Sequence, residues 1–281
     1  MPGGSDLILL YDGSFEGLLA AVFDSYSYSP PPQSLDTADI YQPRLGCRYQ
    51  EAAADPQKTA RVIAGVRRCM GNLGYRKIWQ AFLHDGGDKA TVIYRYIRLG
   101  MREGERIHHM LTHPVVMALD KLVALTGREA NFLTEFIRFS ELEGHVYYAE
   151  ITPEHYVLPL VMPHFAARMN TQPFLIHDKT HGVAGVYDRS GWYLVSTEDM
   201  TVPSLSADEV AYRRLWKTFY DTIAIKERIN PNLRRQLMPK KYWKNMTEMQ
   251  PDFVLERAFA TPPPSSTIAA PSGGALPNAD A

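Results

Sequence analysis

Carboxylate and imidazole side chains are concentrated in two short stretches of the chain. SELEGHVYYAEI carries Glu141, Glu143 and His145, and LIHDKTHG carries His177 and Asp178. A carboxylate beside an imidazole can transfer protons in general acid–base catalysis or bind a divalent cation. The same residue types are common at polar hairpin tips and in turns, where Asp and Gly serve the backbone alone. The five residues are therefore catalytic candidates only if both turns converge on one cleft.

Sequence patterns for metal or nucleotide chemistry are weaker. His109 and His113 are four residues apart in HHMLTH, a spacing that can share a metal on a helix, but Pro114 makes His113 a helix-start residue. The sequence contains no H-E-x-x-H, G-x-x-x-x-G-K-[ST], G-x-G-x-x-G or G-x-S-x-G pattern. Cys47 and Cys69 lack a local motif for an activated thiolate or a structural zinc. We therefore predict neither a metal site nor a cofactor.

The clearest chemical signal is a basic stretch, PNLRRQLMPKKYWKNMTE. Residues 225–244 contain 7 Lys or Arg and 1 Glu, a local charge of +6 in a chain of formal charge −1. Such cations match phosphate oxygens, and an aromatic ring can stack on an unpaired base. The predicted nucleic-acid-binding residues are Arg213, Arg214, Lys217, Arg234, Arg235, Lys240, Lys241, Tyr242, Trp243 and Lys244. In the alternative hypothesis the aromatic rings pack inward and the cations only solvate the segment.

Two sections of different periodicity must position these residues. LILLY predicts a short buried strand from about residue 7, and Asp55 followed by Pro56 predicts a helix over about 56–70. Helical patterns then continue through about residue 136. Gly144 divides two runs rich in aromatic and β-branched residues, which predict a β-hairpin, and three more strands are predicted after it.

The last part of the chain changes character twice. Ser206 can cap a long helix that continues to about residue 229, before Pro231. Residues 261–281 consist largely of Pro, Ser, Ala and Gly, and they predict a disordered tail. The sequence shows no apolar run of roughly 20 residues for a membrane span, no positively charged start typical of a signal sequence and no disulfide framework, so neither export nor membrane insertion is expected. We therefore expect a cytoplasmic protein that does not contact a membrane.

These patterns together predict an α+β fold. One domain is expected over residues 1–260, with a mostly helical N-terminal half, a central antiparallel sheet of about five strands and a long C-terminal helix. The predicted sections are the N-terminal strand and helices in 7–136, the sheet region in 137–200, and the C-terminal helix with the basic segment in 206–250.

Four long blocks carry a resemblance to a known family. LLYDGSFEGLLAAVFDSY, RFSELEGHVYYAEITPEHYVLPLVMPHFAARM, FLIHDKTHGVAGVYD and ERINPNLRRQLMPKKYWKNMTE resemble an uncharacterised bacterial family classed among DNA metabolism proteins. The similarity covers about residues 7–248. Such proteins are encoded beside a radical-SAM protein assigned to DNA repair or modification, and some are fused to a uracil-DNA glycosylase-like domain. No second folded domain is expected after residue 248, so the chain departs from the fused form.

The resemblance implies partners for the protein, but it assigns no catalytic residue. The implied partners are DNA, the radical-SAM protein and a uracil-DNA glycosylase-like protein. We therefore expect a DNA repair or DNA modification protein that is an accessory DNA-binding partner of a radical-SAM enzyme. Two alternatives stay open: an enzyme that acts on nucleic acid or a nucleotide through the His and Glu cleft, and a protein-binding adaptor.

Overall fold

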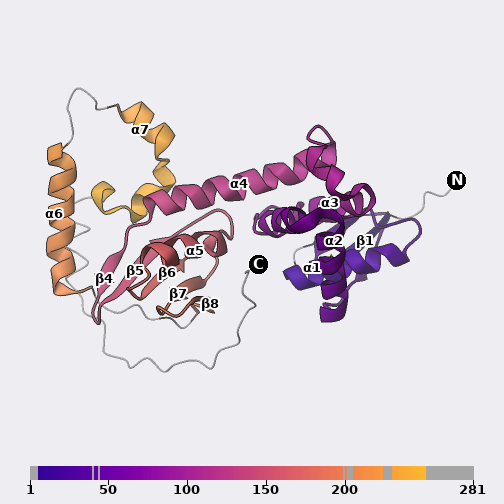
Figure 1. The fold of residues 1–281 in the computed structure, drawn as a ribbon, viewed down its shortest axis with the longest axis horizontal. Coiled ribbons are helices and arrows are strands. Elements are labelled where there is room, and N and C mark those ends of the chain that lie inside the picture. The colour runs from indigo at the N-terminus through magenta and orange to yellow at the C-terminus, as the bar shows by residue number, and fades with distance from the viewer. Residues whose placement is uncertain are drawn as a thin grey trace. The chain divides into compact units, whose positions relative to one another are not determined.

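The structure is a computed structural model, and it describes residues 6–39, 41–43, 45–198, 200, 205–223 and 230–250. The chain divides into two compact units, with the boundary between Arg128 and Glu129 inside helix α4. Each unit has a hydrophobic core of its own. Figure 1 shows the helices and strands of each unit. One domain over 1–260 stays a prediction, and the predicted disordered tail at 261–281 lies outside the described residues.

The first unit combines a small parallel sheet with long helices. Strand β1 (Asp6–Tyr11) lies between β2 (Ser34–Thr37) and β3 (Cys47–Glu51) and runs parallel to both, which confirms the strand predicted at LILLY. The helices of this unit are α1 (Phe15–Asp24), α2 (Pro56–Phe82), α3 (Lys89–Glu103) and the first part of α4 (Pro114–Phe136). Short 3-10 helices occupy Ser25–Ser27 and Gly104–His109.

Capping side chains determine where α1 and α2 begin. Ser14 Oγ accepts the N–H of Gly17 at 2.9 Å, as an N-cap serine does. Asp55 Oδ1 accepts the N–H of Gln57 at 2.8 Å, which confirms the predicted N-cap of α2. The helix is interrupted at Gly71, whose φ of 65° and ψ of −177° are not helical, one residue after the predicted end. Glycine adopts this positive φ without the steric cost that a Cβ would add.

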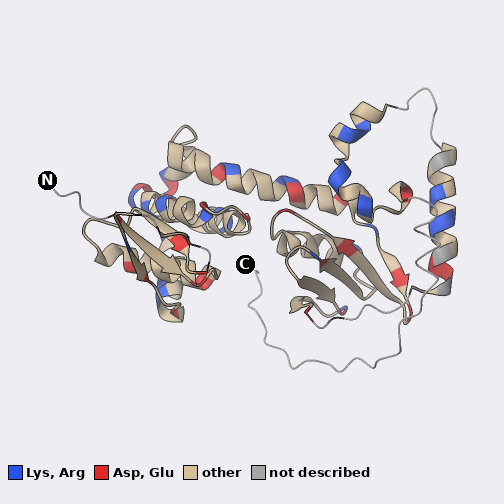
Figure 2. Cartoon of the chain, turned by 180° about the vertical axis from the view of Figure 1, so that it is seen from behind, with Lys and Arg blue, Asp and Glu red and all other residues tan. Residues whose placement is uncertain are grey.

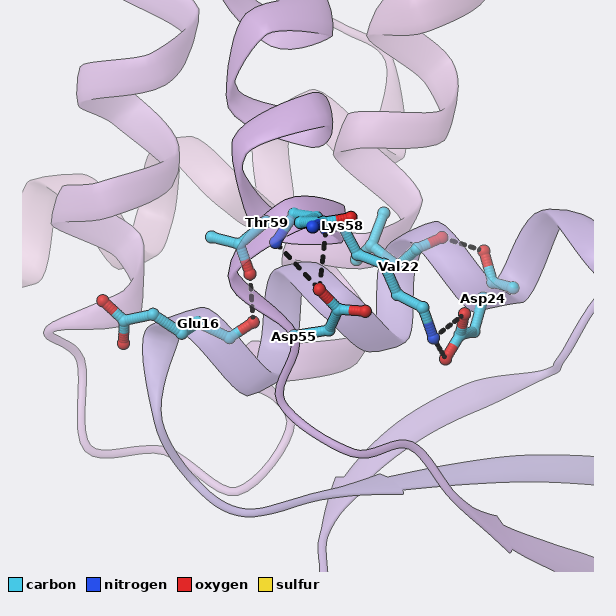
Figure 3. Close-up of polar contacts among 8 residues, drawn as sticks. Glu16, Val22, Asp24, Asp55, Lys58 and Thr59 are labelled. Carbon is cyan, nitrogen blue, oxygen red and sulfur yellow. Dashed lines mark hydrogen bonds and ion pairs between the residues drawn. The ribbon is translucent and has the colours of Figure 1, made fainter.

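Polar contacts fix α1 against α2 (Figure 3). Thr59 Oγ1 donates to the carbonyl of Glu16 at 2.9 Å, and Lys58 Nζ lies 2.8 Å from Asp24 Oδ1. The apolar core of the first unit completes the packing of these helices. Among its fully buried side chains are Tyr11, Leu18, Met70, Ile93 and Ile97.

The second unit is built on a five-stranded mixed sheet in the order β4-β5-β6-β7-β8. The strands are β4 (Ser140–Leu142), β5 (Val146–Ile151), β6 (Phe174–Asp178), β7 (Val183–Tyr187) and β8 (Trp192–Ser196). The α+β class and the five strands are confirmed, but the antiparallel arrangement is wrong at one pair. β5 and β6 run parallel because helix α5 (Leu158–Arg168) carries the chain back between them.

Helix α5 covers one face of this sheet. Phe174, Ile176 and Tyr187 belong to the same buried cluster as Val161 and Phe165 of the helix. At Gly185 an added Cβ would lie 2.3 Å from Met162 Sδ, so the close approach of helix and strand requires glycine. Because side chains alternate along a strand, Tyr148, Glu150 and His177 lie on the opposite face.

The C-terminal section packs beside the edge strand β4. Helix α6 (Ala207–Ile223) confirms the predicted helix as far as Ile223, and 224–229 lie outside the described residues. The next described elements are α7 (Pro231–Leu237) and the 3-10 helices at Lys240–Asn245 and Thr247–Met249. Among the described residues, no helix combines the length and apolar composition that crossing a membrane requires.

Candidate functional site

Two residues of the predicted DNA-binding set are bound to a buried acid. Glu129 is 4% exposed and accepts the backbone N–H groups of Glu154 at 2.9 Å and His155 at 2.8 Å. Lys241 Nζ lies 3.0 Å from Glu129 Oε1 and 3.0 Å from Glu154 Oε1. The Tyr242 hydroxyl donates to Glu129 Oε1 at 3.4 Å. Lys241 and Tyr242 therefore hold the segment onto α4. The inward packing of Tyr242 agrees with the alternative hypothesis, whereas Lys241 pairs with a buried acid instead of only solvating the segment.

Burial and neighbouring charges shift the pKa values of Tyr242 and Lys241. Burial and then the Glu129 charge raise the pKa of the Tyr242 hydroxyl to about 12. Burial acts to lower the pKa of Lys241, but hydrogen bonds to the two carboxylates outweigh it and raise that pKa above its ordinary value. The Tyr242 ring contacts Phe132 and Phe136, with centroid distances of 5.9 and 5.7 Å. Tyr242 is thus a core residue and is not placed to stack on a base.

Helix α6 is also fastened by cations of the predicted set. Arg213 Nε donates to Glu209 Oε1 at 2.8 Å, and its Nη2 donates to the Ser140 hydroxyl. Lys217 Nζ donates to the carbonyl of Gln250 at 3.0 Å. Arg213 and Lys217 therefore have partners within the protein.

A second buried acid, Glu248 of the C-terminal section, contacts both α6 and Arg138, which lies two residues after the end of α4. Glu248 accepts from Arg138 Nη2 at 2.7 Å and from Trp216 Nε1 at 3.2 Å. Burial acts to raise the pKa of Glu248, but these hydrogen bonds outweigh it and hold the pKa below its ordinary value. The Glu248 carboxylate is therefore ionised near neutral pH. It attaches the C-terminal section to Arg138 and to Trp216 of α6.

The remaining cations form what we call the open basic surface: Arg214, Arg234, Arg235, Lys240 and Lys244. All of them are exposed, and none forms a salt bridge with a described residue. Figure 2 shows basic residues along α6 and α7, which carry three of the five. The predicted nucleic-acid set therefore divides into residues that hold the fold and residues whose charges stay open to solvent.

Trp243 organises part of this surface. Its ring is half-buried, and its Nε1 donates to the carbonyl of Met238 at 2.9 Å. Arg234 Cζ lies 5.1 Å from the ring centroid and Lys240 Nζ lies 5.9 Å from it, both within the range of cation–π attraction. The indole thus contacts two cations of the open basic surface.

The first catalytic candidates lie at an exposed hairpin turn. His145 has a φ of 60° and follows Gly144, whose φ is 89°, as the tight turn between β4 and β5 requires. His145 Nδ1 lies 2.6 Å from Glu141 Oε1, while Glu143 is exposed in the turn. The His145 side chain is 93% exposed, so this pair sits at a solvated hairpin tip.

The two turns do not converge. Parallel pairing sets Tyr147 opposite Phe174 and Ile151 opposite Asp178. The hairpin tip therefore precedes one end of this strand pair, and the turn after β6 follows the other end. At about 3.3 Å per residue, the paired strands separate the turns by roughly 15 Å. The hypothesis of one cleft is therefore wrong, because the parallel pairing separates the two turns. It had grouped Glu141, Glu143 and His145 with His177 and Asp178.

Asp178 shapes the turn that follows β6. Its side chain is fully buried, and its Oδ1 accepts the N–H groups of Thr180 at 3.0 Å and His181 at 3.2 Å. Oδ2 lies 2.6 Å from His181 Nδ1. Asp178 satisfies backbone donors of the turn, in agreement with the structural alternative for this stretch. His181, a member of this contact, was not among the predicted site residues.

His177 belongs to a different polar group on the opposite face of the sheet. Its Nδ1 lies 3.0 Å from the Tyr148 hydroxyl, which donates to Glu150 Oε1 at 2.9 Å. Burial lowers the pKa of His177, and burial together with Glu150 raises that of Tyr148. Tyr148 was not singled out from the sequence, although its spacing of two from Glu150 in a strand places both side chains on one face.

The histidines before α4 have a structural explanation. His113 Nδ1 accepts the backbone N–H of Val115 at 3.2 Å, directly before Pro114 opens the helix. This contact confirms the helix-start role predicted for His113. His109 ends the preceding 3-10 helix. Within the described parts of the chain, no group of three or more His, Cys, Asp or Glu side chains is arranged to hold a metal ion.

Comparison with known proteins gives one match. A family model described as "Domain of unknown function (DUF4130)" matches residues 87–248, which is more than half of the chain. No curated protein and no solved structure matches the chain. The matched residues include α3, the five-stranded sheet, α6 and the open basic surface. The chain therefore belongs to the DUF4130 family.

Proposed function

We propose that the protein binds the phosphate backbone of DNA through the open basic surface and acts in DNA repair or DNA modification. The observation that carries the proposal is the set of five exposed cations that lack salt bridges among the described residues. Cations that are not neutralised by a salt bridge can release the counterions of nucleic acid on binding, which drives sequence-independent association.

The neighbourhood of Trp243 supports the same proposal. Arg234 and Lys240 both lie over or beside one indole, whose own N–H is bound to the backbone. Both cations therefore contact one aromatic ring, and neither has a salt bridge to a described carboxylate. Phosphate groups of DNA would gain charge-assisted hydrogen bonds from these cations.

The cellular role proposed here is that of an accessory DNA-binding partner of a radical-SAM enzyme. The support for this partner, and for a uracil-DNA glycosylase-like protein as a second one, is the family resemblance of the four sequence blocks. Acting as an accessory subunit, the chain would supply affinity for the DNA backbone while its partner supplies the chemistry. This division of work fits a site that consists of cations rather than of converging acids and bases.

The DNA-binding proposal is tested by fluorescence anisotropy with labelled duplex and single-stranded DNA over a series of salt concentrations. The double variant Arg234→Gln with Arg235→Gln should bind more weakly. The slope of log affinity against log salt should become shallower by about 0.9 for each duplex phosphate that the variant no longer neutralises. A charge-matched control is Arg68→Gln with Arg76→Gln, two exposed arginines of α2. Equal affinities and slopes for the test variant and the wild type would remove this surface from the DNA site.

The partner is tested by affinity purification of the native protein, followed by identification of the proteins that accompany it. Recovery of a radical-SAM protein supports the accessory role, and DNA titration of the recovered complex measures whether binding is shared. A chain that captures the partner but has no DNA affinity even at low salt would instead be a protein-binding adaptor.

A further inference from the structure

Three arginines of α3 line a cavity in the first unit. Arg95, Arg98 and Arg102 are three and four residues apart, so they share one face of the helix. The cavity has a volume of about 580 Å³, and no Asp or Glu is among its described lining residues. The sequence pattern did not indicate a function for this helix, because its arginines do not form a continuous run.

Arg98 is held in place by tyrosines instead of by an acid. Its Nη1 lies 3.4 Å from the Tyr94 hydroxyl, and its Cζ lies 4.7 Å from the centroid of the Tyr26 ring. Tyr94 is buried, and its hydroxyl donates to the carbonyl of Pro32 at 3.0 Å, which fixes the ring. A guanidinium stacked on an aromatic face keeps its full charge and retains N–H donors at its edge for an anion.

The other two arginines are also incompletely neutralised. Arg95 Nη2 donates to the carbonyl of Gln33 at 3.2 Å, which is a neutral acceptor. Arg102 Nε lies 2.9 Å from Glu103, and its side chain is 73% exposed. Neither Arg95 nor Arg98 forms a salt bridge with a described residue. Like charges at this spacing destabilise a helix, so a bound anion would be stabilising here.

The rest of the lining defines what kind of anion fits. His113 accepts the N–H of Val115 through Nδ1, so its neutral ring carries the proton on Nε2 and is a further donor. Tyr26 is 53% exposed and offers aromatic surface at the cavity. The volume lies within the roughly 300–1,000 Å³ of small-molecule sites and exceeds what a bare phosphate needs.

We propose that this cavity binds a nucleoside phosphate, with the phosphate on the α3 arginines and the base beside Tyr26. Arginine forks match phosphate oxygens in pairs, and a base can stack on an aromatic ring because every base has a π face. The proposal uses no residue of the open basic surface. It is therefore independent of DNA binding by the second unit.

Isothermal titration of the full chain tests the proposal with three probes: adenosine 5′-monophosphate, inorganic phosphate and adenosine. The monophosphate should bind more tightly than either phosphate or adenosine, because only it engages both parts of the site. In the double variant Arg95→Gln with Arg102→Gln, its affinity should fall by about tenfold or more, as expected for loss of charged hydrogen bonds. This variant leaves Arg98 and its tyrosine packing in place, so the fold should be retained.

The matched control is Arg106→Gln, which removes an exposed arginine just after α3 that does not line the cavity. It should bind the monophosphate as the wild type does. Arg98→Lys, which keeps the charge but loses the fork, should weaken binding while the thermal midpoint stays close to that of the wild type. Absence of binding at millimolar monophosphate, or equal affinity in the double variant and the wild type, would overturn the proposal. Monophosphate binding no tighter than phosphate would overturn the assignment to a nucleoside.

Discussion

The ammonium group of Lys241 lies 3.0 Å from the carboxylate of Glu129, a residue 112 positions earlier in the chain. This contact joins the most basic stretch of the sequence to a buried acid of α4. The charge of Lys241 is therefore used within the protein, whereas that of its neighbour Lys244 remains at the surface. Two lysines three residues apart thus have different roles, and this difference can be measured.

Lys241→Gln should destabilise the protein, whereas Lys244→Gln should not. Loss of the Lys241 ammonium leaves the buried Glu129 carboxylate without its cation, at an expected cost of about 1–3 kcal/mol. Lys244 has no such partner among the described residues, and its substitution should change stability by less than about 0.5 kcal/mol. Urea denaturation measures both values, and equal stability of the two variants would contradict the assignment. For DNA affinity we expect the reverse: Lys244→Gln should weaken DNA binding more than Lys241→Gln does.

Glu248 should make the stability of the protein sensitive to acid. Its pKa in the folded protein lies below the ordinary value of 4.5, so the unfolded chain takes up the proton at a higher pH. The stabilisation is then complete above pH 4.5 and is lost as the pH falls through the lower folded pKa. We expect the difference in unfolding free energy between wild type and Glu248→Gln to become smaller as the pH falls from 4.5 through the folded pKa of Glu248. Glu135→Gln, at an exposed position of α4, is the control, and a gap that stays constant would contradict the prediction.

His177 should titrate below its ordinary value of 6.5, because burial disfavours the charged ring. For a histidine with a depressed folded pKa, the unfolded chain binds the proton first. Its contribution to stability is therefore complete above pH 6.5 and declines as the pH falls below it. The midpoint can be followed by NMR of the ring protons. Glu150→Gln should lower it further, because the Glu150 charge favours the protonated ring, and a midpoint at or above 6.5 would refute the prediction.

Gly185→Ala should test how closely α5 approaches the sheet. The new methyl group would meet the sulfur of Met162, a fully buried side chain with little room to move. Overpacking of this kind costs about 1–3 kcal/mol. Gly191→Ala adds a methyl group at a position with no neighbouring atom within 4 Å and should be nearly neutral. Urea denaturation midpoints compare the Gly185→Ala and Gly191→Ala variants. Equal midpoints would show that α5 can move to accommodate the methyl group, contrary to the prediction.

The positions of the strands were easier to predict from the sequence than their pairing in the sheet. A run rich in apolar, aromatic and β-branched residues identifies a strand, as at Val146–Ile151 and Phe174–Asp178. It does not show which strands are neighbours or in which direction they run. The decisive signal was the helix between them, because a crossover of this length permits parallel pairing. Parallel pairing of β5 and β6 places the two turns at opposite ends of the strand pair.

The basic stretch shows a second limit of sequence patterns. Local charge identifies where cations are dense, and it led to Arg234 and Lys240 at the open basic surface. It cannot show which cations meet an acid from another part of the fold, as Lys241 meets Glu129. The α3 arginines show the converse, because helical spacing and folding bring together charges that do not form a run in the sequence.

The DUF4130 match begins at residue 87, close to the start of α3, although α3 packs within the first unit. Ile93 and Ile97 are fully buried in a cluster that includes Leu18 and Met70, and both of these precede the match. A polypeptide trimmed to the family boundaries would expose that apolar face of α3 to water. The family match and the compact units therefore have different boundaries in this chain, because the match includes α3 without much of the core that buries it.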